Sequence, residues 1–263
     1  MSLDNLIEQL RTSSISDTGV YRGICSAAAQ SKVVFDEFRR LPGYTRILEH
    51  VSQEQGQAYL DEIRRLAPHV LRDPTWFTAN DEHGNPIQFD YKDIGLVSPT
   101  TLRYVKVAVE LQSLFGVEVL NNARVIEIGG GYGGQARILK ALFPATQYTT
   151  MQYTIIDLPE PLALADAYLK KYNMHVDLID GLRYAQPNTS IGLPGDVFIS
   201  NYALTECSPD VMAIYIKHVA LNCSHGYITG NAQEKRLFEL LPRARRLDET
   251  PLTGPGNFVC VWP

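Results

Sequence analysis

Apolar residues in the second half of the chain fall into short runs that alternate with helical stripes. Alternation at this spacing predicts a parallel sheet covered by helices on both faces. The last run has no helix after it, so it is expected to join the sheet late, with the polar segment Arg243–Glu249 as one further candidate strand. The predicted strands are Val125–Ile128, Tyr153–Asp157, Met174–Ile179, Asp196–Ser200, Tyr227–Gly230 and Phe258–Trp262.

The first hundred residues show a helical pattern instead. Ser2 can cap a helix with an apolar stripe through Leu10. Near the other end of the chain, Asn231 lies three residues before Glu234, and this spacing predicts a capping box. We therefore divide the chain into an N-terminal helical region with a substrate-side loop, residues 1–97, and an α/β domain, residues 98–263. Further helices are expected at Val33–Arg40, Gln53–Ala67, Ser98–Gly116 and Pro159–Lys171.

Composition narrows the class of partner. The 263 residues are 45% hydrophobic and 20% charged with a net charge of −5, which disfavours nucleic acid as the main partner. No apolar run is long enough for a membrane span, and the N-terminus lacks the pattern of a secretory signal. The four cysteines are far apart in the sequence, and no two of them form a CxxC motif, as expected for reduced thiols. We expect a cytoplasmic protein that acts on small molecules.

The most informative motif is VIEIGGGYGG, in which a strand runs into glycines that open a helix. Such a turn brings backbone N–H groups close to a ligand. Two templates fit. Gly129, Gly131 and Gly134 match the pyrophosphate loop of dinucleotide-binding enzymes. Alternatively, Glu127 with Gly129, Gly131 and Gly133 matches the loop of S-adenosylmethionine enzymes.

Two acidic residues and the end of the chain favour the second template. Glu127 is a carboxylate inside an apolar strand, where burial is costly unless it accepts hydrogen bonds from a ligand or from the loop. Asp157 ends the second strand, where an acid can accept from ribose hydroxyls in either type of enzyme. An antiparallel final strand is the methyltransferase pattern. In addition, no tyrosine has a lysine four positions on, so the acid pair of short-chain reductases is absent.

The segments SPTTLRY, EIGGGYGG, IIDLPE and SNYALTECS together resemble the sugar O-methyltransferases, a branch of the class I S-adenosylmethionine-dependent methyltransferases. The resemblance covers roughly Tyr91 to Pro263. It implies a Rossmann-like, seven-stranded, mostly parallel sheet with an antiparallel last strand, S-adenosylmethionine as cofactor, and methyl transfer to a hydroxyl of a sugar or glycan-type acceptor. By resemblance, the methionyl end is held by Glu127 and the glycine loop (Gly129, Gly130, Gly131, Gly133). Asp157 is assigned to the ribose and Asp180 to the adenine region, with Leu158 and Asn201 as further cofactor-binding residues.

Methyl transfer to an alcohol requires a proton acceptor. Ligands of open α/β sheets bind at the carboxyl ends of the strands, so the segment after the fourth strand is the place to expect it. Glu206 is the first candidate for the catalytic base, with Asn201 and Tyr202 as catalytic residues that orient the reacting groups. A plain helix-cap role for Glu206 stays open. His218 and His225 are weaker candidates because of their expected positions.

The long loop before Ser98 contains aromatic residues that suit either a sugar ring or packing of the helical region onto the sheet. Its aromatic and polar candidates are Trp76, Phe77, Phe89, Tyr91, His83, Lys92 and Asp93. A divalent metal stays open, since no spacing of acidic residues identifies a site.

Two other functions remain as alternatives. One is an NAD(P)-dependent oxidoreductase of Rossmann type, and the other is a non-catalytic module that binds the cofactor. The expected partners are small molecules, without nucleic acid or membrane, and the oligomeric state stays open, a homodimer included.

Overall fold

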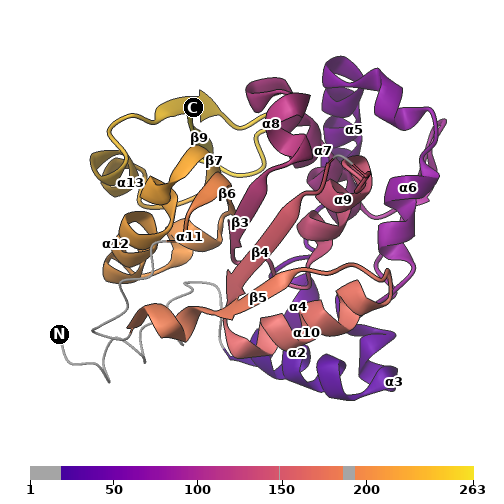
Figure 1. The fold of residues 1–263 in the computed structure, drawn as a ribbon. Helices are drawn as coiled ribbons and strands as arrows, with labels where there is room; N and C mark the ends of the chain where they lie inside the picture. The colour runs from indigo at the N-terminus through magenta and orange to yellow at the C-terminus, as the bar shows by residue number, and fades with distance from the viewer. Residues whose placement is uncertain (1–18, 148, 186–192) are drawn as a thin grey trace.

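The computed structural model describes residues 19–147, 149–185 and 193–263 (Figure 1), so the helix expected after Ser2 lies outside the described residues. The strands are β1 (Phe89–Tyr91), β2 (Gly95–Val97), β3 (Arg124–Ile128), β4 (Gln152–Asp157), β5 (Asp177–Asp180), β6 (Gly195–Asn201), β7 (Cys223–Gly230), β8 (Arg245–Asp248) and β9 (Phe258–Trp262). The α-helices are α2 (Val20–Gln30), α3 (Lys32–Phe35), α4 (Pro42–Thr45), α5 (Gln53–Leu66), α6 (Thr75–Thr78), α7 (Pro99–Phe115), α8 (Val117–Asn121), α9 (Gly134–Leu142), α10 (Pro159–Lys170), α11 (Ala203–Glu206), α12 (Pro209–His218) and α13 (Glu234–Leu240).

The main sheet has seven strands in the order β5-β4-β3-β6-β7-β9-β8. The five strands from β5 to β7 are parallel, whereas β9 is antiparallel to both β7 and β8. This confirms the predicted α/β, Rossmann-like sheet with its antiparallel last strand, and the polar candidate strand is present as β8. The strand order reverses between β3 and β6, and the carboxyl ends at such a reversal form the usual ligand crevice.

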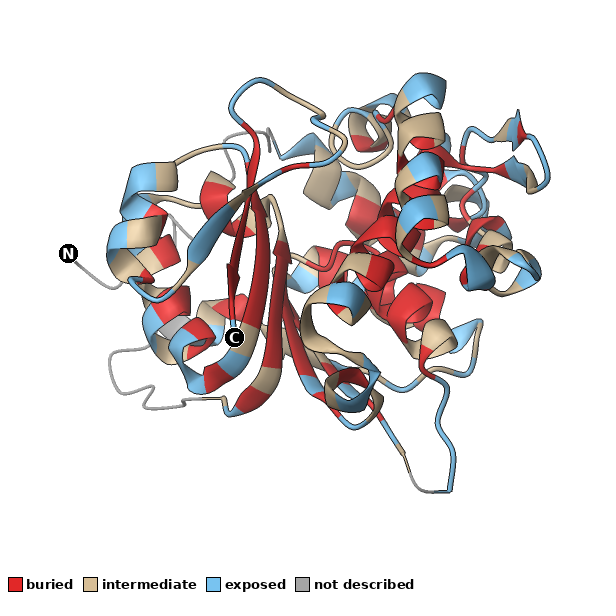
Figure 2. Cartoon of the chain, turned by 90° about the horizontal axis from the view of Figure 1, so that it is seen from above, coloured by how far each residue is buried: buried red, intermediate tan, exposed pale blue. Residues whose placement is uncertain are grey.

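Each face of the sheet carries its own hydrophobic core, because residues along a strand alternate between the two faces. Val125 of β3 packs with α7, α9 and α10, while Ile126 packs with α12 and α13. Figure 2 shows the resulting burial along the central strands. Glu127 follows Val125 by two positions, so it points to the face that α7 and the N-terminal helices cover. Of the helices that the structure describes, none has the length and hydropathy to cross a bilayer.

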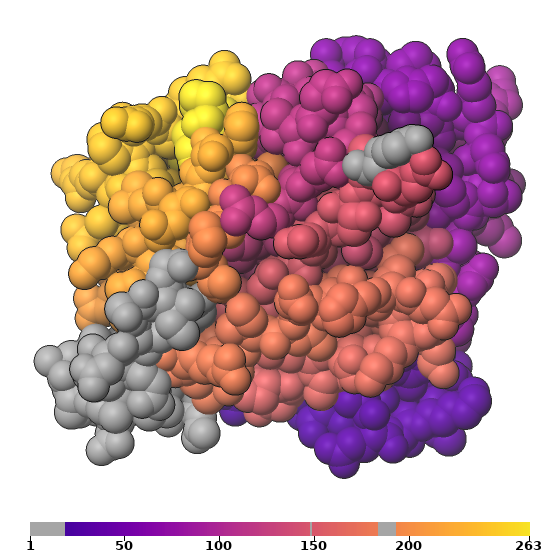
Figure 3. All heavy atoms as spheres, viewed as in Figure 1, coloured from indigo at the N-terminus to yellow at the C-terminus, as the bar shows by residue number. Residues whose placement is uncertain are grey.

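The N-terminal helices pack directly onto the α/β domain. Helix α2 contacts α10 and helix α5 contacts α7, and in Figure 3 the indigo and violet surface of these helices adjoins the surface of the later elements. Ser98 caps α7 by accepting a hydrogen bond from the Thr101 N–H, as the sequence predicted. Because α7 lies between the sheet and the N-terminal helices, nearly every residue of its first three turns is buried, including Arg103 and Lys106.

A buried network centred on Arg39 fastens this packing. Its guanidinium is fully buried and pairs with Glu49 at 2.6 Å and with Asp81 at 2.8 Å. It also donates to the Ser98 hydroxyl at 3.0 Å, and Asp81 in turn accepts a hydrogen bond from the Thr101 hydroxyl at 2.7 Å. Burial raises the pKa of Glu49, and the positive charge of Arg39 opposes that rise. Arg39 therefore fixes the segment before α5 against the start of α7.

One predicted cap is wrong. Helix α13 begins after Gln233, which adopts a left-handed conformation with a φ of 54° and makes no side-chain cap. The Gln233 amide donates instead to the carbonyls of Thr205 and Cys207, at 2.8 and 2.6 Å. These two bonds fix the entry to α13 and leave the Asn231 side chain free of the helix.

We predict that Arg39→Met lowers the free energy of unfolding by about 3–5 kcal/mol, because it leaves Glu49 and Asp81 buried without their counter-charge. Urea denaturation of the purified protein measures this. The matched control is Arg124→Met, which removes an exposed arginine paired with Asp196 at 3.0 Å and is expected to lower stability far less, because solvent screens an exposed ion pair. Equal losses in the two variants would contradict the assignment.

Candidate functional site

The glycine loop turns sharply between β3 and α9. Gly129 has a φ of 76°, and a Cβ at this position would lie 2.1 Å from the Cβ of Ala203. The turn therefore requires glycine, which lets the chain after β6 lie directly against the loop. Gly130 and Gly131 line a cavity, whereas Gly133 begins α9 in a left-handed conformation above Leu169. Loop residue Tyr132 is fully buried under Arg39, with the guanidinium 4.9 Å from the ring centroid.

Asp157 holds the loop from the end of β4. Its Oδ2 accepts a hydrogen bond from the Gly131 N–H at 3.1 Å, and its Oδ1 accepts from the Leu158 N–H at 2.7 Å. Asp157 and Leu158 both line the cavity. A carboxylate oxygen accepts more than one hydrogen bond, so Asp157 can orient the loop and still accept from a pair of ligand hydroxyls.

Glu127 is the buried acid of the site. It is 2% exposed, lines the cavity and accepts a hydrogen bond from the Tyr153 hydroxyl at 2.9 Å. Burial raises the pKa of Glu127 to about 8, with a further contribution from the negative charge of Asp157. A cationic group in the cavity would oppose both effects and stabilise the ionised carboxylate.

The segment after β6 forms the opposite wall. Asn201 accepts from the Thr229 hydroxyl at 3.3 Å, while its buried Nδ2 has no hydrogen-bond partner within the described residues. Tyr202 adopts a φ of 67° and donates its hydroxyl proton to Glu249. Glu206 accepts a hydrogen bond from the Asn231 Nδ2 at 2.8 Å. Asn231, which the sequence predicted as a helix cap, therefore binds Glu206 instead. Asn201, Tyr202 and Glu206 all line the cavity, and their roles in catalysis stay predictions.

Sequence reasoning missed the N-terminal wall. Leu48 and His50, from the segment between α4 and α5, line the cavity together with Tyr59 of α5 and Arg103 of α7. The Leu48 side chain lies against Gly131 of the glycine loop. Partial burial lowers the pKa of His50, and the positive charge of Arg103 lowers it further. No local motif marks Leu48, His50 or Tyr59, because only the packing of α5 on α7 brings them to the cavity. Arg103 belongs to the SPTTLRY segment, but the sequence pattern assigned it no role.

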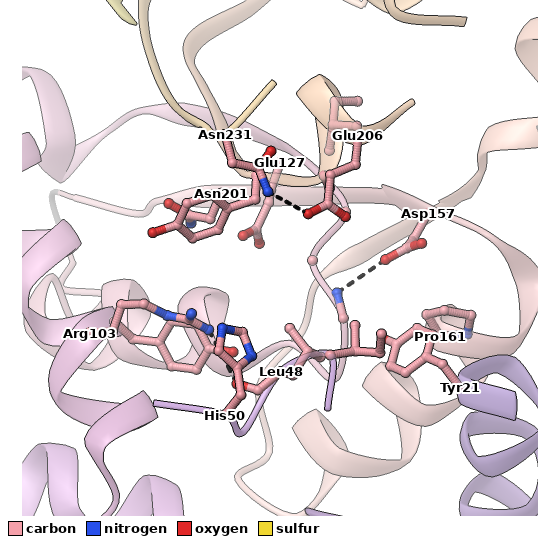
Figure 4. Close-up of a pocket in the computed structure, with 18 of the residues that line it drawn as sticks. Tyr21, Leu48, His50, Arg103, Glu127, Asp157, Pro161, Asn201, Glu206 and Asn231 are labelled. Atoms are coloured by element: carbon pink, nitrogen blue, oxygen red, sulfur yellow. Dashed lines mark hydrogen bonds between the residues drawn. The ribbon is translucent and has the colours of Figure 1, made fainter. Parts of the chain in front are cut away.

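The enclosed space measures about 330 Å³, within the range of small-molecule sites. Figure 4 shows Glu127, Asn201, Glu206 and Asn231 on one side, and Leu48, His50 and Arg103 on the other. The cavity lies at the carboxyl ends of β3, β4 and β6, where the fold predicts a ligand.

Other predicted residues lie elsewhere. Asp180 pairs in register with Asp157, but its Oδ1 accepts from the Leu182 N–H at 2.9 Å, and the described residues that line the cavity do not include it. Its role at an adenine ring therefore stays a prediction. His218 ends α12, and His225 lies within 3.3 Å of the Asp196 carbonyl at the far end of the sheet.

The aromatic residues before Ser98 serve packing, the second of their two expected roles. Phe77 is fully buried in the core on the α7 face. The Trp76 indole donates to the Val70 carbonyl at 2.9 Å, and the Tyr91 hydroxyl donates to the Gln53 carbonyl at 3.2 Å. No group of three histidine, cysteine, aspartate or glutamate side chains suited to a metal occurs in the described ranges.

No protein-family model matches the chain. No curated protein matches it either. Among solved structures, the pyocyanin biosynthetic protein PhzM is similar at 12% identity over 62% of this chain and 55% of that one, with a TM-score of 0.47. A SAM-dependent methyltransferase from Aquifex aeolicus matches at 14% identity over 59% and 87% of the two chains, with a TM-score of 0.43.

The mitomycin 7-O-methyltransferase MmcR is similar at 15% identity over 59% of this chain and 56% of that one, with a TM-score of 0.39. The chain thus spans about half the length of PhzM and MmcR. Similarity at these levels carries no conclusion about function. The fold assignment rests on strand order and register.

We predict that Glu127 makes the ligand-free protein less stable as pH rises from about 5 to 8. The folded state keeps a proton on Glu127 that the unfolded chain releases near its ordinary pKa, so this contribution to stability is complete below that pKa and is lost through pH 8. The slope is at most about 1.4 kcal/mol per pH unit. Glu127→Gln removes it, so the difference between wild-type and variant unfolding free energies should change with pH. Parallel curves would contradict the raised pKa.

Proposed function

We propose that the chain is an S-adenosylmethionine-dependent O-methyltransferase that acts on a hydroxyl of a sugar or sugar-containing metabolite. The observation that carries this proposal is the buried Glu127 beside the glycine loop, at the point where strand order reverses. Glu127 and Asp157 make this end of the cavity acidic. An acidic cavity favours a ligand with positive charge, and S-adenosylmethionine has both an ammonium and a sulfonium.

The side chains present fit this cofactor group by group. Glu127 would accept hydrogen bonds from the methionyl ammonium, and the unpartnered Asn201 Nδ2 would donate to the methionyl carboxylate. Asp157 would accept from the ribose hydroxyls. The loop at Gly129 and Gly130 passes close enough to its neighbours that a side chain would clash, which leaves the backbone itself as the surface for the ligand.

Glu127 disfavours a dinucleotide. A pyrophosphate on this loop could not pair with the Glu127 carboxylate, whereas a cationic ligand group would stabilise its ionised form in this buried site. Moreover, a Cβ at Gly134 would lie 2.5 Å from the Tyr104 ring and 2.7 Å from the Tyr132 ring. The glycine at position 134 is therefore explained by the close packing of Tyr104 and Tyr132, and a pyrophosphate site is not needed to explain it.

Methyl transfer then requires alignment and a proton acceptor. S-adenosylmethionine supplies an electrophilic methyl group bound to sulfur. In the bound complex, Glu206 would accept the proton that the acceptor hydroxyl loses when it takes up the methyl group. Asn231 orients the Glu206 carboxylate through the 2.8 Å hydrogen bond. Orientation of the two reactants contributes on the order of 7–11 kcal/mol in favourable cases.

A hydroxyl acceptor suits the remaining walls. Tyr59, Gln55 and Tyr202 line the cavity and provide aromatic faces and hydrogen-bonding groups, a combination that suits a sugar ring. The sugar assignment itself follows from the sequence resemblance. If the chain were instead a non-catalytic module, it would bind the cofactor product without methylating any acceptor.

We predict that S-adenosylhomocysteine binds to the purified protein and that NAD does not, as measured by isothermal titration calorimetry. Incubation with S-adenosylmethionine and a panel of sugars, sugar nucleotides and glycans should give a product 14 mass units heavier, the mass of one added CH₂ by chemical composition. Exclusive NAD binding would favour the oxidoreductase. Binding of S-adenosylhomocysteine without any product would favour the non-catalytic module.

We predict that Glu206→Gln lowers kcat by about 10²–10⁴-fold, the usual contribution of a positioned base, and changes S-adenosylhomocysteine affinity less than threefold. His50→Gln is the matched comparison, because His50 faces the same cavity and its lowered pKa leaves the imidazole able to accept a proton. It should lower kcat less than tenfold. The reverse ranking would assign the base to His50.

A further inference from the structure

Arg103 is a buried cation that the cofactor assignment does not use. It lies in α7, is 7% exposed and lines the cavity. Figure 4 shows Arg103 and His50 together, across the cavity from Asp157. The positive charge of Arg103 lowers the pKa of His50 and opposes the rise that burial causes in the pKa of Tyr59. At the other end of the cavity, the negative charge of Asp157 raises the pKa of Glu127. The cavity therefore has an acidic end and a basic end.

Of the buried cations in the described residues, only Arg103 both lines the cavity and lacks an ion pair. Arg39 pairs with two carboxylates, and Lys106, one turn further along α7, pairs with Glu110 at 2.8 Å. In contrast, no ion pair to Arg103 occurs among the described residues, and the nearby Glu49 is already bound by Arg39.

The neutral contacts of Arg103 leave its donors unfilled. One terminal nitrogen donates to the Leu48 carbonyl at 3.4 Å, and the buried Nε has no acceptor in the described part of the chain. The guanidinium carbon lies 5.7 Å from the ring centroid of Tyr104 and 5.9 Å from that of Tyr202. Such ring contacts are weak compared with the cost of burying a charge without a counter-ion. An anion from the ligand would supply the missing partner.

We propose that Arg103 binds an anionic group of the methyl acceptor, a carboxylate or a phosphate, so that the preferred acceptor is a sugar acid or sugar phosphate. The inference rests on the proposed function. A guanidinium binds both groups through two parallel N–H···O bonds. We assign the anion to the acceptor because the Asn201 Nδ2, which has no partner among the described residues, is available to the methionyl carboxylate, while Arg103 lies on the opposite wall with His50.

The experiment compares matched ligands on the intact protein saturated with S-adenosylhomocysteine. Calorimetry measures the affinities for galacturonate against galactose and for glucose 6-phosphate against glucose. Wild-type protein should bind the anionic member of at least one pair tenfold or more tightly. Arg103→Met should abolish that preference and change the Kd of S-adenosylhomocysteine less than twofold. Arg103→Lys keeps the charge but not the paired donors, so it should reduce the preference severalfold, and it serves in place of Arg103→Met if the latter does not fold. The control Arg72→Met removes an exposed arginine outside the cavity and should retain the preference.

Three results would overturn the inference. The first is the absence of any anion preference in wild-type protein with either pair, and the second is a preference that persists in Arg103→Met. A tenfold loss of S-adenosylhomocysteine affinity in Arg103→Met, with unchanged affinity for 5′-methylthioadenosine, would assign the anion to the cofactor instead. Failure of the proposed function is distinct: if wild-type protein does not bind S-adenosylhomocysteine, the sugar titrations are run without it, and an Arg103-dependent preference would still uphold the anion site.

Discussion

The structure depends on the buried pairing of Arg39 with Asp81 and Glu49, because this pairing determines where the N-terminal wall of the cavity lies. Glu49 stands between Leu48 and His50, both of which line the cavity. Asp81 in turn holds the first turn of α7 through Ser98 and Thr101. One guanidinium thus connects a wall of the site to the helix that carries Arg103. The α/β domain supplies the glycine loop, and the Arg39 network closes the space above it.

The cavity has acidic side chains at one end and a buried cation at the other. Burial keeps Glu127 protonated near neutral pH, and no ion pair to Arg103 occurs among the described residues. A core selected only for stability would give Glu127 and Arg103 partners of opposite charge or have apolar residues in their place. Retaining them is consistent with a site that gains its compensation from ligands: a cation beside Glu127 and an anion beside Arg103. Stability and ligand binding are therefore opposed at the same residues.

The sequence pattern predicted the features that depend on residues close together in the chain. The strands, the glycine loop, Glu127 and Asp157 were predictable because a strand, its turn and the following residue are continuous in sequence. Arg103, His50 and the Arg39 network were not, because their partners are 10 to 59 residues away in the sequence and are brought together by helix packing. The predicted cap at Asn231 was wrong because Gln233, held by two carbonyls of the preceding segment, begins α13 instead. The aromatic loop was ambiguous because packing and ligand binding require the same residue types.

The most direct test of the account is a crystal structure of the protein with S-adenosylhomocysteine bound. The account predicts the ligand at the carboxyl ends of β3, β4 and β6, its ammonium at Glu127 and its ribose at Asp157, with the acceptor side left open toward His50 and Arg103. A ligand bound outside this cavity, or one whose ammonium points away from Glu127, would contradict it.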